Sequence, residues 1–149
     1  MFRLPVTVLM LTALVAVPLL ALAADDPSHE RHELMESMGD AAKPLGGMLK
    51  GENEFDAAMA MKSLDTFQDV ASRVGSLFPV GSYEPGEKKA SEAVWTDREG
   101  FDDRLASFAA AVDAAIEANP QSLDELKPVA SEVFNNCKAC HEDYRTPGD

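Results

Sequence analysis

Five residues near the end of the chain constrain its structure more than any other feature. Cys137-Lys138-Ala139-Cys140-His141 places two cysteines three positions apart, with a histidine directly after the second. On a helix, the two thiols and the imidazole share one face. This spacing is the attachment signature for haem c, in which the thiols form thioethers with the haem and the imidazole ligates the iron. The motif therefore predicts one covalently bound haem c on the last helix.

Other kinds of site also use closely spaced cysteines. The pair would equally suit a small-loop disulfide, a Cys-X-X-Cys redox site or half of a zinc site. Structural zinc needs four protein ligands, and the other histidines, His29 and His32, lie far earlier in the chain. A thioredoxin-type motif follows a strand in a βαβ unit, and no alternating strand pattern occurs in this sequence. These alternatives stay open, with haem attachment as the favoured interpretation.

The first residues have the composition of an export signal. Arg3 supplies a positive start, residues 4–22 are almost entirely apolar, and Ala21-Leu22-Ala23 gives the small-X-small cleavage pattern. We predict a signal peptide over 1–23, a single domain over 24–149 and a periplasmic location. Because the apolar run approaches the length of a membrane span, an uncleaved anchor is the alternative.

The chain is strongly acidic, with a formal net charge of −13. Such a charge excludes nucleic-acid binding through phosphates, which requires lysine and arginine. It indicates protein partners with basic surfaces, whose association would weaken as salt concentration rises.

Beyond the signal, apolar residues recur every three or four positions in four segments, which predicts four amphipathic helices. The expected ranges are 26–50, 55–78, 96–119 and 122–145. Capping boxes beginning at Thr96 and Ser122 mark the starts of the last two helices. Pro44 and Pro128 fall inside the first and last helices, where a missing N–H should bend the backbone.

Four such helices with mostly short connections predict an all-α, antiparallel up-down-up-down four-helix bundle. In that topology the start of the first helix and the end of the last lie at the same end. His141 is about one turn from the end of the last helix, and Met35 is about two turns into the first. The two side chains would face each other across one haem bound there.

The order of these motifs resembles the class II c-type cytochromes, the cytochrome c′ family, whose attachment motif lies near the C-terminus of a four-helix bundle. The resemblance covers essentially the whole chain after the signal. It rests on these segments: Arg31 to Met35, Pro44-Leu45-Gly46, Leu77 to Ser82, Val94 to Asp97 with Phe101, and Cys137 to Arg145. It implies that Cys137 and Cys140 form the thioethers and that His141 is the proximal iron ligand.

The resemblance also implies roles for residues outside the motif. Arg31 matches a family arginine that lies near a haem propionate, and Lys89 would neutralise a propionate as well. Met35 matches the position whose side chain covers the distal face of the iron. From packing alone, Met35 is equally a core residue, since methionine fills irregular gaps.

The family divides at the sixth coordination position of the iron. Relatives in which a methionine closes this position transfer electrons, whereas members with an open position bind NO or CO. Because a thioether can ligate iron, we predict one-electron transfer by a monohaem protein with Met35 as a ligand, and no enzymatic activity. The alternative is a five-coordinate cytochrome c′ that binds NO or CO. A homodimer is a further arrangement that the resemblance allows.

Overall fold

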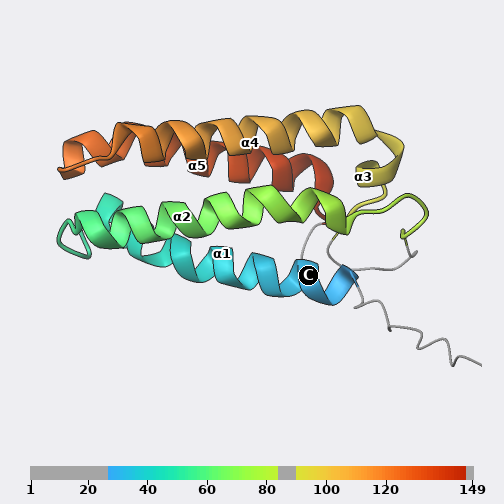
Figure 1. The fold of residues 1–149 in the computed structure, drawn as a ribbon, viewed down its shortest axis with the longest axis horizontal. Helices are drawn as coiled ribbons and strands as arrows, with labels where there is room; N and C mark the ends of the chain where they lie inside the picture. Colours follow the sequence, from blue (N-terminus) through green and yellow to red (C-terminus); the bar gives the residue numbers. More distant parts are fainter. Residues whose placement is uncertain (1–26, 84–89, 147–149) are drawn as a thin grey trace, which may run out of the picture.

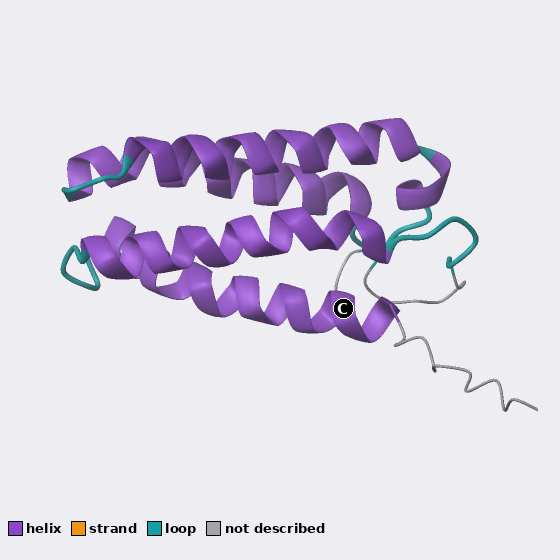
Figure 2. Ribbon diagram, viewed as in Figure 1, coloured by secondary structure: helices purple, strands orange, loops and turns teal. Residues whose placement is uncertain are grey.

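The computed structural model describes residues 27–83 and 90–146, and within them the chain is predominantly helical (Figure 2). The elements in chain order are α1 (Pro27–Lys50), α2 (Ala57–Val74), the 3-10 turn η1 (Gly75–Leu77), α3 (Ala93–Thr96), α4 (Arg98–Ala118) and α5 (Leu123–Tyr144). The four long helices, α1, α2, α4 and α5, form an antiparallel bundle (Figure 1). The predicted all-α four-helix fold is therefore confirmed. The predicted signal peptide and Lys89 lie outside the described residues.

The start of α4 differs from the predicted capping box by one residue. Asp97, and not Thr96, is the N-cap, and its carboxylate accepts a hydrogen bond from Gly100 N at 3.4 Å. The Thr96 hydroxyl instead donates to Glu92 O at 3.2 Å within the short helix α3. The prediction was wrong because the sequence pattern gave no sign that a separate helical turn precedes α4. The capping carboxylate is thereby placed next to the end of α5.

The start of α5 agrees with its predicted N-cap at Ser122, but the Glu125 carboxylate bonds the backbone N–H of Gln121 and not that of Ser122, as a capping box would. The Ser122 hydroxyl accepts from Glu125 N at 3.3 Å, and the Glu125 carboxylate accepts from Gln121 N at 2.7 Å. Asn119, in the left-handed region with φ 41°, ends α4 just before this cap. The connection between α4 and α5 is therefore short and closed by local hydrogen bonds.

Neither proline interrupts its helix. α1 continues through Pro44 and α5 through Pro128. In the turn that follows α1, the Gly47 carbonyl accepts from Glu52 N at 2.9 Å and from Asn53 N at 3.2 Å. A Cβ at Gly47 would overlap the Asn53 side chain. The turn therefore places the Asn53 side chain directly against Gly47.

The helices pack as two closely associated pairs. α1 packs mainly on α2, and α5 packs mainly on α4, while α2 and α4 join the pairs. α1 and α5 contact each other only sparsely. The largest core cluster is almost entirely aliphatic apart from two phenylalanines and consists of Leu45, Met48, Ala60, Leu64, Phe67, Phe108, Val112, Ala115, Leu126, Ala130 and Val133. Within residues 27–83 and 90–146, no helix combines the length and hydrophobicity that a membrane span requires.

Candidate functional site

The predicted attachment motif lies in the last turns of α5. Cys137 and Cys140 are both half-buried, and His141 is exposed. Cys137 packs against the aliphatic core, whereas Cys140 packs against the aromatic cluster around Phe101. Both thiols are free. The motif is therefore held on a rigid helix with its sulfur atoms partly accessible.

The electrostatic environment disfavours a redox dithiol at this position. Burial raises the pKa of the Cys137 thiol to about 11, and it also raises the pKa of the Cys140 thiol. Reactive redox cysteines have the opposite property, a pKa lowered toward neutrality that generates the thiolate. Partial desolvation, with the charge of Arg145, lowers the pKa of His141. This favours the neutral imidazole, which is the form that ligates a metal.

The first turns of α1 carry the other two described site residues. Arg31 is buried, its guanidinium donates to Leu77 O at 2.8 Å, and its Cζ lies 4.8 Å from the centroid of the Phe78 ring. Met35, one turn later, is half-buried and packs against the apolar cluster of Leu34, Val70, Val74 and Leu77. Arg31 thus ties the start of α1 to the chain that follows α2.

A series of aromatic rings connects the start of α1 to the end of α5. Phe78 lies under Arg31 and is 5.0 Å from Phe101, which is 5.3 Å from Tyr144 (ring centroids). The beginning of α1, η1, α3 and the end of α5 accordingly lie together (Figure 1); we call this the site end of the bundle. Met35 therefore lies at the same end of the bundle as His141, as the topology predicted.

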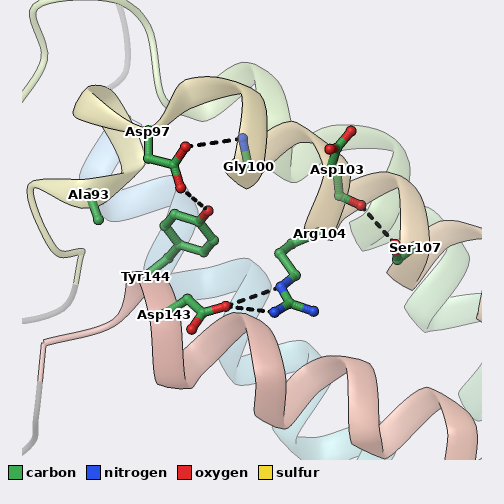
Figure 3. A pocket seen from close by; sticks show the side chains of 8 residues that line it. All are labelled: Ala93, Asp97, Gly100, Asp103, Arg104, Ser107, Asp143 and Tyr144. Carbon is green, nitrogen blue, oxygen red and sulfur yellow. Dashed lines mark hydrogen bonds and ion pairs between the residues drawn. The ribbon is translucent and has the colours of Figure 1, made fainter.

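The last turn of α5 is bonded to α4 by two side-chain contacts. The Tyr144 hydroxyl donates to Asp97 Oδ2 at 2.7 Å, and Arg104 donates to Asp143 Oδ2 at 2.9 and 3.1 Å (Figure 3). These residues line a surface pocket of about 580 Å³ between α4 and α5. Sequence reasoning assigned them no role, because Tyr144 and Asp97 are 47 positions apart and neither belongs to a motif that names its partner.

The residues present fit a covalently bound haem. The two thiols are free, lie three residues apart on one half-buried face of a helix, and are followed directly by a histidine whose pKa is lowered. Within the described part of the chain, no group of three or more His, Cys, Asp or Glu side chains is arranged to hold a metal ion. The donor set of the motif thus suits haem attachment better than it suits a zinc site.

Comparisons with known proteins agree with this chemistry. A model of the Cytochrome C' family matches residues 26–145. The chain is 38% identical over 125 residues to a cytochrome c' of Rhodopseudomonas palustris, covering 84% of this chain and 85% of the relative. It is 32% identical over 143 residues to a cytochrome c-556 of the same organism, covering 93% of this chain and 95% of that protein.

A solved structure gives the same result at the level of the fold. The structure of a cytochrome c' from Rhodopseudomonas palustris superposes on this chain with a TM-score of 0.79 at 36% sequence identity. The match covers 85% of this chain and 100% of that chain. Taken with the free cysteine pair at the end of α5, these matches establish that the chain belongs to the cytochrome c′ family of non-enzymatic haem proteins, which includes the c-556 and c-554 relatives.

Proposed function

We propose that this chain is a periplasmic monohaem cytochrome that transfers one electron at a time. Residues 1–23 form its cleaved signal peptide, Cys137 and Cys140 hold the haem, and His141 and Met35 ligate the iron. The observation that carries the proposal is the position of Met35. Its thioether belongs to a half-buried side chain in the first turns of α1, and His141 is in the last turn of α5. These two helix ends lie at the same end of the bundle (Figure 1).

The protein's own residues supply rigidity and ligands. The Met35 side chain packs against the buried Leu34 and the apolar residues of α2, and these contacts hold it in place. Partial desolvation lowers the pKa of His141, which favours its neutral, metal-ligating form. A haem bound there supplies the one-electron centre. Methionine–histidine ligation keeps six ligands in both oxidation states, so electron exchange needs little rearrangement.

Arg31 and Lys89 are proposed as partners of the haem propionates. Arg31 lies one turn before Met35 on α1, and a guanidinium offers five N–H donors in a fixed geometry. The hydrogen bond from Arg31 to Leu77 O orients the side chain at the site end. Lys89 belongs to the proposal through the family resemblance alone, since it lies outside the described residues.

The test is Met35→Leu, with Met38→Leu as its matched control. Both methionines pack against the same apolar cluster, and leucine for methionine preserves volume at a cost usually under about 1.5 kcal/mol. If Met35 ligates the iron, the wild type shows a low-spin absorption spectrum and binds CO slowly. Met35→Leu then becomes high-spin and binds CO rapidly, while Met38→Leu retains the wild-type spectrum.

The second candidate function is gas binding at an open sixth position. A structure of similar fold from Alcaligenes xylosoxidans, at 22% identity and a TM-score of 0.72, is a nitric oxide complex of a cytochrome c prime variant. A wild type that is already high-spin and already binds CO rapidly would contradict electron transfer through a closed site and favour this second function. In that case Met35→Leu would alter only the rate of gas binding.

A further inference from the structure

We infer that Tyr144 and Asp97 are positioning residues that fix the turn of α5 bearing His141, so that the orientation of the imidazole depends on a hydrogen bond to α4. The inference concerns residues that do not belong to the attachment motif. It rests on His141 as the proximal ligand and is independent of whether Met35 ligates the iron.

The need for such a contact follows from where the motif lies. α5 ends at Tyr144, so His141 is in its last turn. The final carbonyl groups of a helix have no partners within it, and this turn frays unless other groups hold it. The backbone bond that closes this end, from Arg145 N to His141 O, is long at 3.3 Å. A ligand in this turn needs support from outside the helix.

Tyr144 receives that support on both its side chain and its backbone. Its hydroxyl donates to Asp97 Oδ2 at 2.7 Å, a short bond to a carboxylate of the kind that is stronger than neutral hydrogen bonds (Figure 3). Its carbonyl accepts from Ser91 N at 2.9 Å, and the next residue, Arg145, forms an isolated antiparallel bridge with Ala90. The chain is therefore held immediately after the turn that carries His141.

Asp97 is itself fixed by a second role. Its other oxygen, Oδ1, accepts from Gly100 N and caps α4, so the carboxylate that receives the Tyr144 hydroxyl is anchored to a helix start. The space for this arrangement exists because residue 100 is glycine. A Cβ at Gly100 would lie 2.6 Å from the Tyr144 hydroxyl oxygen and 2.5 Å from Asp97 Oδ2.

The ion pair between Arg104 and Asp143 supports the same turn from the exposed side, but it is a weaker constraint. Both side chains are nearly half-exposed, at 45% and 46%. Exposed ion pairs contribute little because water and salt screen them. Tyr144, in contrast, is buried against Phe101. The Tyr144–Asp97 hydrogen bond is therefore the contact that we assign to positioning.

The experiment compares three variants of the haem-loaded full-length mature protein. Tyr144→Phe removes only the hydroxyl. Asp97→Ser retains a good N-cap residue but lacks the second carboxylate oxygen. Ser122→Ala is the matched control, because it removes the N-cap of α5 at the opposite end of the same helix and lowers stability without touching the site end.

Two measurements separate positioning from general destabilisation. The first is the set of hyperfine-shifted proton resonances of His141 in the oxidised protein, which report the orientation of the imidazole in either spin state. The second is amide hydrogen exchange at residues 141–145. We expect Tyr144→Phe and Asp97→Ser to shift the His141 resonances and to accelerate this exchange by about tenfold, the effect of losing one charge-assisted hydrogen bond. Combining the two substitutions should add little, because they remove the same bond.

Ser122→Ala should lower the melting temperature but leave both measurements at wild-type values. Unchanged His141 resonances in Tyr144→Phe and Asp97→Ser would overturn the inference, and so would equal shifts in Ser122→Ala. Failure of the proposed electron-transfer function has a different signature. It appears as a high-spin wild type, affects all of these proteins alike and leaves the comparison between variants intact.

Discussion

The two ends of the bundle are stabilised by different kinds of interaction. At the far end, formed by the turns 51–56 and 119–122, short connections are closed by local caps such as those of Asp56 and Ser122. The core beside them is the cluster of mainly aliphatic residues. At the site end, aromatic rings, a buried arginine and directed hydrogen bonds hold a longer connection and three separate chain segments together.

This difference separates stability from positioning. The hydrophobic effect is non-directional, so an aliphatic core can stabilise a bundle without specifying how a polar side chain is oriented. Hydrogen bonds depend on angle and distance, so they fix side chains at the site where orientation matters. We therefore expect changes at the far end to alter stability alone, and changes at the site end to alter the site as well as stability.

The largest expected effect comes from removing both attachment points with Cys137→Ala and Cys140→Ala. The wild type should retain its colour through acid–acetone extraction, and the double variant should lose its pigment to the organic phase. Because the haem stabilises only the folded state, the variant should lose at least about 4 kcal/mol of unfolding free energy. Thermal unfolding followed by circular dichroism measures this loss. Equal melting of the two proteins would show that the site end needs no cofactor.

Leu126→Ala tests the far end. Leu126 is fully buried in the aliphatic cluster at the beginning of α5. Its truncation should cost about 3 kcal/mol of unfolding free energy, measured by urea denaturation, because it leaves a cavity in a packed core. The folded fraction should retain the wild-type haem spectrum. A change of spin state in this variant would contradict the separation of the two ends.

Gly100→Ala tests the close approach at the site end. The added Cβ would meet both Tyr144 and Asp97, so we expect a loss of about 2 kcal/mol, the usual range for overpacking. Gly39→Ala is the matched control, since a Cβ at this helical position has no atom within 4 Å. That substitution should raise stability by about 0.5–1 kcal/mol through backbone entropy. Denaturation midpoints that move in the same direction for both variants would contradict the packing argument.

The smallest expected effect is on the pH dependence of stability. The hydrogen bond to Asp97 raises the pKa of Tyr144 to about 12. Burial and the charge of Asp143 add to this rise, and the charge of Arg104 opposes it. Tyr144 therefore contributes stability in full below about pH 10, the ordinary tyrosine value, and that contribution is lost as pH rises toward 12.

Melting temperatures measured from pH 8 to pH 12 check this contribution. Tyr144→Phe should melt below the wild type at pH 8, and the difference should shrink as the pH approaches 12. Tyr83→Phe, whose ring packs at a tilt against Trp95, is the control and should follow the wild type. A difference between Tyr144→Phe and the wild type that is constant over the whole range would contradict the pKa assigned to Tyr144.

The sequence by itself determined the class of fold and the attachment motif, because both depend on local order along the chain. The apolar spacing in α1, α2, α4 and α5 follows from helical geometry, and Cys137, Cys140 and His141 are neighbours in sequence. The Ser122 cap was predicted for the same reason, since all of its partners lie within four residues.

Only the tertiary structure decided which distant residues meet at the site end. The Thr96 cap was predicted wrongly because α3 is stabilised by its packing on α4 and α5 rather than by its own short sequence. The Tyr144–Asp97 bond, the Gly100 approach and the contacts of Arg31 with Leu77 and Phe78 join segments more than 40 residues apart. Such pairs leave no periodic signal in the sequence, because the packing of whole helices, and not local spacing, brings their atoms within hydrogen-bonding distance.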